Sequence, residues 1–244
     1  MIFISCNQKK EIAASTKEEI AHKIESKNNI TETETNSKVD TIVLDSKNNY
    51  NRADKILIHR TKILKSKQNG ETIFYSIDFY KKSQKFFSHS YVSKNVYEGE
   101  EWSGYDEFFN DTIAKISDKR FINLSVGVPA CGYGHINFLF FLGEKSIQLV
   151  CEYQSIGDGI YSNSDDFQPV FKGNKVVSFV RKNVSIDSDE SKPFDEEDEK
   201  LLITFQDSMF YDYQNNIWKG KNLSPKGKVY RKVFTSYKKY FKQN

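Results

Sequence analysis

The stretch Ile136-Asn137-Phe138-Leu139-Phe140-Phe141-Leu142 carries the strongest fold signal in this sequence. Successive residues of a β-strand point to opposite faces of the sheet, and this run is apolar at nearly every position. A strand of that composition is buried on both faces. We therefore expect it to be a central strand, with other parts of the chain packed on each side.

Short turns flank this stretch and recur elsewhere in the chain. Three of them join strand-like runs: Asn69-Gly70 between 55–65 and 72–80, Gly143-Glu144-Lys145 between 135–142 and 146–153, and Gly173-Asn174 between 167–171 and 175–184. Such turns connect antiparallel neighbours, and Asn-Gly is the strongest short hairpin signal. Residues 86–92 and 121–128 also have the composition of strands. These patterns predict a sheet built from hairpins.

Two internal segments show helical spacing. Residues 105–117 place Phe108, Phe109, Ile113 and Ile116 on one side, and residues 194–213 begin with a run of acids. Acidic side chains favour the positive end of a helix. The run 201–205 has the composition of a strand as well, so this second helix competes with a strand.

The C-terminus predicts an amphipathic helix. Ser224 is a suitable N-cap with Pro225 at the first helical position. Aromatic and apolar residues then recur at spacings of three and four, at Tyr230, Val233, Phe234, Tyr237 and Phe241. The sum is an α+β fold, with a mostly antiparallel sheet, a few helices and an amphipathic C-terminal helix.

The N-terminus contains Phe3-Ile4-Ser5-Cys6, which resembles the lipobox of bacterial lipoproteins. In that family the signal peptide is cleaved before the cysteine, and the cysteine is acylated. The resemblance implies that Cys6 carries a lipid and that residues 1–6 are the remnant of a signal peptide. Because most of the apolar stretch of such a signal is missing, either the true start lies upstream of Met1 or Cys6 is an ordinary cysteine. The resemblance also implies a protein anchored to the bacterial cell envelope, facing the periplasm or the exterior.

The composition after Cys6 agrees with an anchored protein. Residues 7–54 are polar and rich in Lys, Glu, Asn, Thr and Ser, including the repetitive stretch 28–36. Such a segment buries too little apolar surface to offset its ordering entropy. We expect a flexible tether over 7–54 and a single globular domain over 55–244. A disordered tail without an anchor has the same composition.

The chain offers few candidates for chemistry. It has four histidines, none paired at the spacing of a zinc site, and it has no HExxH, CxxC, GxSxG or phosphate-binding loop. We therefore expect no metal and no cofactor. Cys131 and His135, four residues apart in a glycine-rich turn, are weak candidates for a nucleophile and its base. A turn that leads into the central strand explains the same residues.

The other two cysteines form a candidate disulfide. If Cys6 is acylated, Cys131 and Cys151 remain, and an even pair in an oxidising compartment suits a disulfide. A hairpin centred between Glu144 and Lys145 places Cys151 opposite Phe138 instead of Cys131. A bridge therefore requires residues 129–134 to fold back or to cross to another strand.

Charge is unevenly distributed along the chain. The net charge is +3, but residues 187–199 hold eight acids and one base, whereas 219–244 hold nine basic residues and no acid. The acids Asp195, Glu196, Glu197, Asp198 and Glu199 are candidates for binding a basic protein partner. A solvated loop, neutralised by the basic C-terminus, is the alternative. Because only five of the 36 basic residues are Arg, we expect no nucleic-acid partner.

These observations leave three classes of function. The first is a lipid-anchored, non-catalytic binding protein, one version being a periplasmic immunity protein that neutralises a secreted toxin. The second is an envelope hydrolase that uses Cys131 and His135 or an unrecognised pair of carboxylates. The third is a glycan-binding protein, because Tyr and Trp side chains stack on sugars; its candidates are Tyr97, Trp102, Tyr105, Tyr211, Tyr213 and Trp218.

Overall fold

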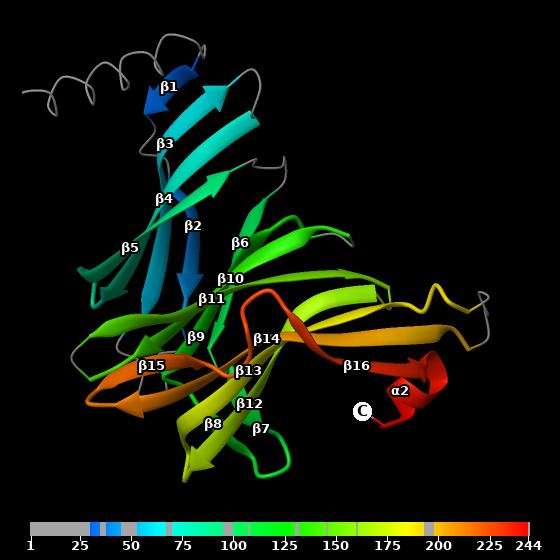
Figure 1. Ribbon diagram of the computed structural model, residues 1–244. Coiled ribbons are helices and arrows are strands. Elements are labelled where there is room, and N and C mark those ends of the chain that lie inside the picture. Colours follow the sequence, from blue (N-terminus) through cyan, green and yellow to red (C-terminus); the bar gives the residue numbers. More distant parts are fainter. Residues whose placement is uncertain are drawn as a thin grey trace, which may run out of the picture. The chain divides into compact units, whose positions relative to one another are not determined.

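The computed structural model describes residues 30–34, 38–44, 53–66, 70–94, 100–106, 108–129, 132–144, 146–159, 161–192 and 198–243. These residues form strands β1 to β16 and one helix, α2 (Figure 1). The chain divides into two compact units. The first holds the described parts of Met1–Ser37, His59–Ser76 and Ser90–Val96, and the second holds those of Lys38–Ile58, Ile77–His89 and Tyr97–Asn244.

The second unit is built on a nine-stranded antiparallel sheet. Its strands follow the order β15 (Ile217–Asn222), β14 (Lys200–Gln214), β13 (Lys175–Ser188), β12 (Tyr161–Lys172), β11 (Ile147–Asp158), β10 (Gly134–Leu142), β9 (Phe121–Gly127) and β6 (Glu101–Asp106). The ninth strand, β16 (Val229–Ser236), pairs with β14 beside β15 and leads into α2 (Tyr237–Gln243). A short hairpin, β7 (Phe109–Asp111) and β8 (Ile116–Asp118), lies outside this sheet.

The remaining strands form a five-stranded sheet. Its order is β1 (Ile30–Glu34), β3 (Lys55–Ser66), β4 (Gly70–Lys81) and β5 (Gln84–Lys94), with β2 (Lys38–Val43) also paired to β3. Strands β3, β4 and β5 each run through both units. Within the first unit, β1 pairs antiparallel with β3, and the rings of Tyr75 and Tyr91 stack 6.2 Å apart.

The run 136–142 is a strand with both faces buried, as its composition predicts. Phe138 and Phe140 of β10 are fully buried, and Phe140 contacts Phe79 of β4 with ring centroids 5.1 Å apart. On the opposite face Phe141 contacts Phe121 of β9 at 5.1 Å and Trp218 of β15 at 5.8 Å. One strand therefore separates two aromatic clusters.

The second of these clusters shows that the nine-stranded sheet curls. Phe121 on β9 and Trp218 on β15 are far apart in the strand order, yet their rings lie 5.2 Å apart. The sheet opens between β11 and β12, which pair only over Ile156–Asp158 and Tyr161–Asn163. Phe167 of β12 and Tyr153 of β11 fill this opening from the inside, with ring centroids 5.0 Å apart.

The α+β prediction is wrong, because the described residues form an almost entirely antiparallel β structure with one short helix. The predicted helix over 105–117 is replaced by the end of β6 and the hairpin β7–β8. Helical spacing there grouped Ile113 with Phe109, but Ile113 is 95% exposed and Phe109 is 2% exposed. Phe109 enters the core and Phe108 packs against it, whereas Ile113 is exposed to solvent.

The helix predicted over 194–213 is β14 in its described part, because residues 200–206 lie between β13 and β16. Because this segment pairs with a strand on each edge, it is itself a strand, which is the alternative that the composition of 201–205 allowed. The C-terminal helix is confined to Tyr237–Gln243, since Val229–Ser236 also pairs with β14. Spacings of three and four in a short aromatic-rich run thus did not distinguish helix from strand.

The strand pairs predicted from the short turns are confirmed. The pairs β10–β11 and β12–β13 are antiparallel neighbours joined at the predicted turns, and β3 is the neighbour of β4. Near its turn the β10–β11 register is as predicted, with Phe140 opposite Leu149. A bulge then shifts the register by one, so Cys151 lies opposite Leu139 instead of Phe138.

The N-terminal predictions fall partly outside the described residues. Cys6 and the rest of 1–29 are among those not described. The segment predicted to be a tether includes Ile30–Glu34 and Lys38–Val43, which are strands β1 and β2. The boundaries at residues 6 and 54 stay predictions. In the described part of the chain, no helix has the length and apolar composition needed to cross a membrane.

Candidate functional site

A pocket of about 970 Å³ lies at the end of the second unit where four hairpin turns meet. These turns are β4–β5 at Lys82-Ser83, β10–β11 at Gly143-Glu144, β12–β13 at Gly173-Asn174 and β14–β15 at Asn215-Asn216. Each turn, or the strand end beside it, contributes lining residues. Antiparallel hairpins repeated along a sheet place alternate turns at one end, which explains why the three turns of the nine-stranded sheet converge. We call this feature the basic pocket.

The floor of the basic pocket is apolar. Phe141, Leu142 and Val176 line it and are at most 2% exposed. The ring of Tyr213 packs against Phe141 with centroids 5.1 Å apart. Phe86, which is 45% exposed, adds an aromatic surface on the β5 side. The floor is thus the outer end of the aromatic core.

The rim is positively charged. Lys81, Lys82 and Lys175 line the pocket and are exposed, and among the described lining residues Glu144 is the one acid. Among the residues that the structure describes, none of these three ammonium groups forms an ion pair. Their charge is therefore available to a ligand.

A strained turn positions two of these lysines. Lys82 and Ser83 have φ angles of 48° and 66°, a left-handed conformation in which Gly and Asn are preferred. The backbone N–H of Lys82 donates to the carboxylate of Asp54 at 2.5 Å, which holds the turn in place. A lysine in that conformation carries a local conformational cost, a pattern that clusters at functional sites.

Arg120 also lines the pocket, but its charge is already paired. Its Nε and Nη2 donate to the two carboxylate oxygens of Asp118 at 2.8 and 2.5 Å. Asp118, 2% exposed, also accepts the Val176 N–H at 2.8 Å, and the guanidinium lies 5.0 Å from the centre of the Phe141 ring. Arg120 thus fixes the pocket wall, and the lysines supply its unpaired charge.

A second polar cluster lies inside the curled sheet. Asp165 of β12, with 1% of its side chain exposed, forms a salt bridge with Arg181 of β13. Asn183 donates to Asp165 at 3.1 Å, and Gln206 donates to Asn183 at 2.9 Å. Burial lowers the pKa of Arg181 and the charge of Asp165 raises it, with a net upward shift that keeps the guanidinium charged. These groups satisfy one another and hold β12, β13 and β14 together.

The predicted catalytic pair is not brought together by any described contact, because Cys131 lies outside the described residues. His135 lies on β10 opposite Gly127 of β9, where its ring occupies the space that a Cβ at Gly127 would need. The hydrolase hypothesis therefore stays a prediction.

Cys151 is buried in the aromatic core, 7% exposed. Burial raises the pKa of its thiol to about 12, so the thiol stays protonated at neutral pH and is a poor nucleophile. Its disulfide with Cys131 stays a prediction as well.

Two of the five acidic partner-binding candidates have internal roles. Asp198 accepts the Lys238 backbone N–H at 2.9 Å, and this bond at the start of α2 lowers the pKa of its carboxyl. Glu199, 7% exposed, accepts the Ser188 hydroxyl at 2.6 Å, and its carbonyl accepts the Tyr237 N–H at 2.8 Å. Asp195, Glu196 and Glu197 are outside the described residues.

The aromatic candidates for glycan binding are mostly internal. Trp102, Tyr211 and Trp218 are 4–6% exposed and belong to the core, Tyr213 is half-buried, Tyr105 is 50% exposed, and Tyr97 is not described. Among the described residues no group of three His, Cys, Asp or Glu side chains is arranged to hold a metal ion.

Sequence reasoning missed the basic pocket and the Asp165–Arg181 cluster. Polar side chains at alternate positions, Asn163 and Asp165 on β12 and Arg181 and Asn183 on β13, are a detectable signal for a polar interior. The lysines beside the turns carry no sequence signal that distinguishes them from ordinary solvated turn residues. No protein-family model, no curated protein and no solved structure matches this chain.

Proposed function

We propose that this protein is a non-catalytic binding protein that holds an anionic ligand with an apolar part in the basic pocket, and that a lipid on Cys6 anchors it to the bacterial cell envelope. One observation carries the binding site: Lys81, Lys82 and Lys175, without ion pairs among the described residues, surround an apolar floor. A carboxylate, sulfonate or phosphate group pairs with such a rim. An attached apolar group covers the floor.

The size and lining of the pocket agree with this ligand class. Ligand sites are commonly about 300–1,000 Å³, mainly apolar, with a few polar groups that fix orientation. The basic pocket has a volume near the upper end of that range. Its floor belongs to the packed core, so the pocket is preformed and the ligand does not have to order it.

The surroundings of the Cys151 thiol favour binding over catalysis. The thiol of Cys151 is buried, with a pKa raised to about 12, and it does not line the basic pocket. The lysines on the rim have no neighbouring general base among the residues that line the pocket with them, apart from the single carboxylate of Glu144.

Two dyes of the same shape test the proposal. Anilinonaphthalene sulfonate is anionic, and N-phenyl-1-naphthylamine is its neutral counterpart; both fluoresce in apolar surroundings. We expect the anionic dye to bind the wild type, and the variant Lys82→Gln/Lys175→Gln to bind it about tenfold more weakly. Affinity for the neutral dye should stay the same.

Lys219→Gln/Lys226→Gln is the matched control, since both lysines are exposed and neither lines the pocket. Equal losses of affinity in this control and in Lys82→Gln/Lys175→Gln would show that net charge, not the pocket, attracts the dye. Equal affinity of the wild type for both dyes would contradict the proposed ligand class.

The anchor has a separate test. Cys6→Ser in the native organism should move the protein from the membrane fraction to the soluble fraction, and labelling with a radioactive fatty acid should disappear. Retention of the variant in the membrane fraction would contradict the lipid anchor and leave the binding pocket unaffected.

A further inference from the structure

Strand β16 has one edge with no strand partner in the described part of the chain. Its other edge pairs with β14 from Lys200↔Ser236 to Gln206↔Val229. The backbone N–H and C=O groups along an unpaired edge form a ready template for another extended segment.

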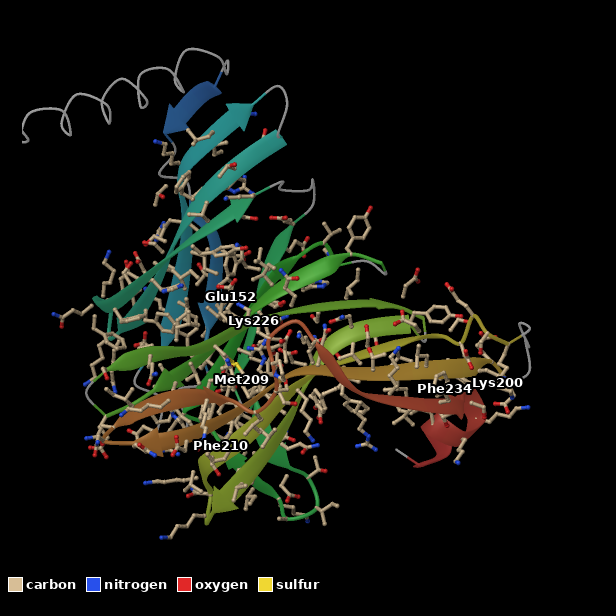
Figure 2. All side chains as sticks on the ribbon, in the orientation of Figure 1. Glu152, Lys200, Met209, Phe210, Lys226 and Phe234 are labelled. Carbon is tan, nitrogen blue, oxygen red and sulfur yellow. The ribbon has the colours of Figure 1, made fainter. Side chains whose placement is uncertain are left out.

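The side chains of β16 are unusually exposed for a strand. Phe234 is 63% exposed, Tyr230 45% and Val229 44%. Val229, Lys232 and Phe234 share one face, because side chains alternate along the strand and a register shift places Val229 opposite Gln206, which leaves Tyr230 as the extra residue of a bulge. Figure 2 shows Phe234 on the part of β16 that precedes α2. Val233 on the opposite face packs against the small cluster of Ile186, Leu201 and Ile203, which keeps the strand attached to the sheet.

The strand is also strongly basic. Lys228, Arg231 and Lys232 lie on or beside it, and Lys238 and Lys239 follow on α2. In the described part of the molecule, none of these five side chains takes part in an ion pair. Arg231 instead lies 5.0 Å from the centre of the Phe205 ring. Unpaired charge, exposed apolar groups and a free backbone edge thus coincide on one strand.

We propose that the free edge of β16 binds an extended acidic segment of a partner protein, which adds a strand beside β16. The backbone edge provides hydrogen bonds, Val229 and Phe234 provide apolar contacts, and the cations select acidic side chains at alternate positions. A second copy of β16 is disfavoured, because it would bring Arg231 and Lys232 beside identical cations. This site is separate from the basic pocket, whose lining includes no residue of β16.

The free backbone edge favours a protein segment over an anionic membrane. A membrane makes no use of backbone donors and acceptors at a strand edge, and it binds a surface whose cations and apolar groups face one plane. Here Lys232 shares a face with Phe234, but Arg231 lies on the opposite face.

Capped ten-residue peptides test the proposal with the full chain. The probe alternates Glu and Val, a second peptide alternates Lys and Val, and a third has the same net charge as the probe but has Pro at every third position. Fluorescence anisotropy should show binding of the first peptide alone. The proline peptide should fail, because it cannot donate a regular row of hydrogen bonds. Equal binding of the proline peptide would reduce the interaction to nonspecific charge attraction and overturn the proposal.

Variants locate the site. Lys228→Glu/Lys232→Glu should weaken binding of the Glu/Val peptide at least tenfold, and Phe234→Ser should weaken it about threefold without a change in melting temperature. The matched control Lys219→Glu/Lys221→Glu makes the same change in net charge on β15 and should retain binding. Loss of binding in the control but not on β16 would contradict the assignment.

Two further measurements address the other occupants. The first uses vesicles of phosphatidylglycerol. If the wild type binds the vesicles but no peptide, and Lys228→Glu/Lys232→Glu does not bind the vesicles, then β16 is a membrane-binding surface and the proposal is overturned. Sedimentation that shows a dimer disrupted by the same variant would assign the edge to a second copy and overturn it as well.

Discussion

The side-chain amide of Gln148 on β11 forms two hydrogen bonds with the backbone of Trp218 on β15. Its Nε2 donates to the Trp218 carbonyl at 2.8 Å, and its Oε1 accepts the Trp218 N–H at 2.8 Å. The amide thereby pairs with Trp218 as a neighbouring strand would. This contact joins two strands that are not neighbours in the sheet and keeps the curled sheet closed around its aromatic core.

Replacing Gln148 with Ala should destabilise the protein by about 1–3 kcal/mol, because it leaves the N–H and C=O of buried Trp218 without their partners. Urea unfolding followed by Trp fluorescence measures the effect. The control is Gln154→Ala, an exposed position on the same strand, which should change stability by less than about 0.5 kcal/mol. A Gln148→Ala protein as stable as the control would show that the sheet closes without this contact.

The buried pair Asp165–Arg181 should be sensitive to loss of one partner. Asp165→Asn leaves the Arg181 charge uncompensated in a largely buried site, at a cost of about 3–5 kcal/mol. Replacing both, as Asp165→Leu/Arg181→Met, should recover at least half of that loss. Asp166→Asn is the control, because Asp166 is exposed and bonds to Gln168 alone among the contacts described for it. A double variant less stable than Asp165→Asn would contradict this account.

Stability should fall at alkaline pH because of Cys151. Burial raises the pKa of its thiol from 9.0 to about 12, so between these values the unfolded state loses a proton that the folded state keeps. Folding is therefore progressively disfavoured from about pH 9 to pH 12.

The variant Cys151→Ala separates this effect from that of Tyr211, whose pKa burial raises from 10.0 to about 12. In Cys151→Ala the decline in urea midpoint should begin about one pH unit higher than in the wild type. Identical pH profiles for the two proteins would show that the Cys151 thiol does not titrate differently in the folded state.

Gly127 should not tolerate a side chain. A Cβ there would lie 2.5 Å from Cδ2 of His135 and 2.8 Å from the carbonyl oxygen of Gly134. Gly127→Ala should therefore lower the free energy of unfolding by about 1–3 kcal/mol. Adding His135→Ala should recover only a part of that stability, because the contact with the backbone of Gly134 remains. Gly157→Ala, where the nearest atom is 3.9 Å away, should stay within about 1 kcal/mol of the wild type in thermal unfolding. Full recovery by His135→Ala would contradict the backbone clash.

Local signals predicted the hairpins of this protein well. The turns at Gly143-Glu144 and Gly173-Asn174 join the strands that the sequence indicates, because a short loop leaves its two flanking strands no other partner within reach. The same locality explains the correct register near the β10–β11 turn. It also explains the error at Cys151, since a bulge depends on packing and has no signal in the turn.

The helix predictions over 105–117 and 194–213 are wrong because helical spacing in a short aromatic-rich segment does not distinguish a helix from a strand. In 201–205 the composition allowed a strand, but the acids at 195–199 favoured a helix start. The carboxylate of Asp198 instead accepts the Lys238 N–H at the start of α2, which is distant in sequence, and the carboxylate of Glu199 accepts the Ser188 hydroxyl. The prediction that these two acids belong to the start of a helix over 194–213 is therefore wrong.

The sequence by itself determined the central buried strand, the antiparallel hairpins and the separation of charge along the chain, because each depends on residues within one turn or one strand. Only the tertiary structure decided that β14 and β16 are strands, that the sheet curls until Gln148 reaches Trp218, and that four turns bring Lys81, Lys82 and Lys175 around one pocket. Those features arise from backbone pairing and aromatic packing between segments far apart in the chain, and a pattern of neighbouring residues contains no information about such partners.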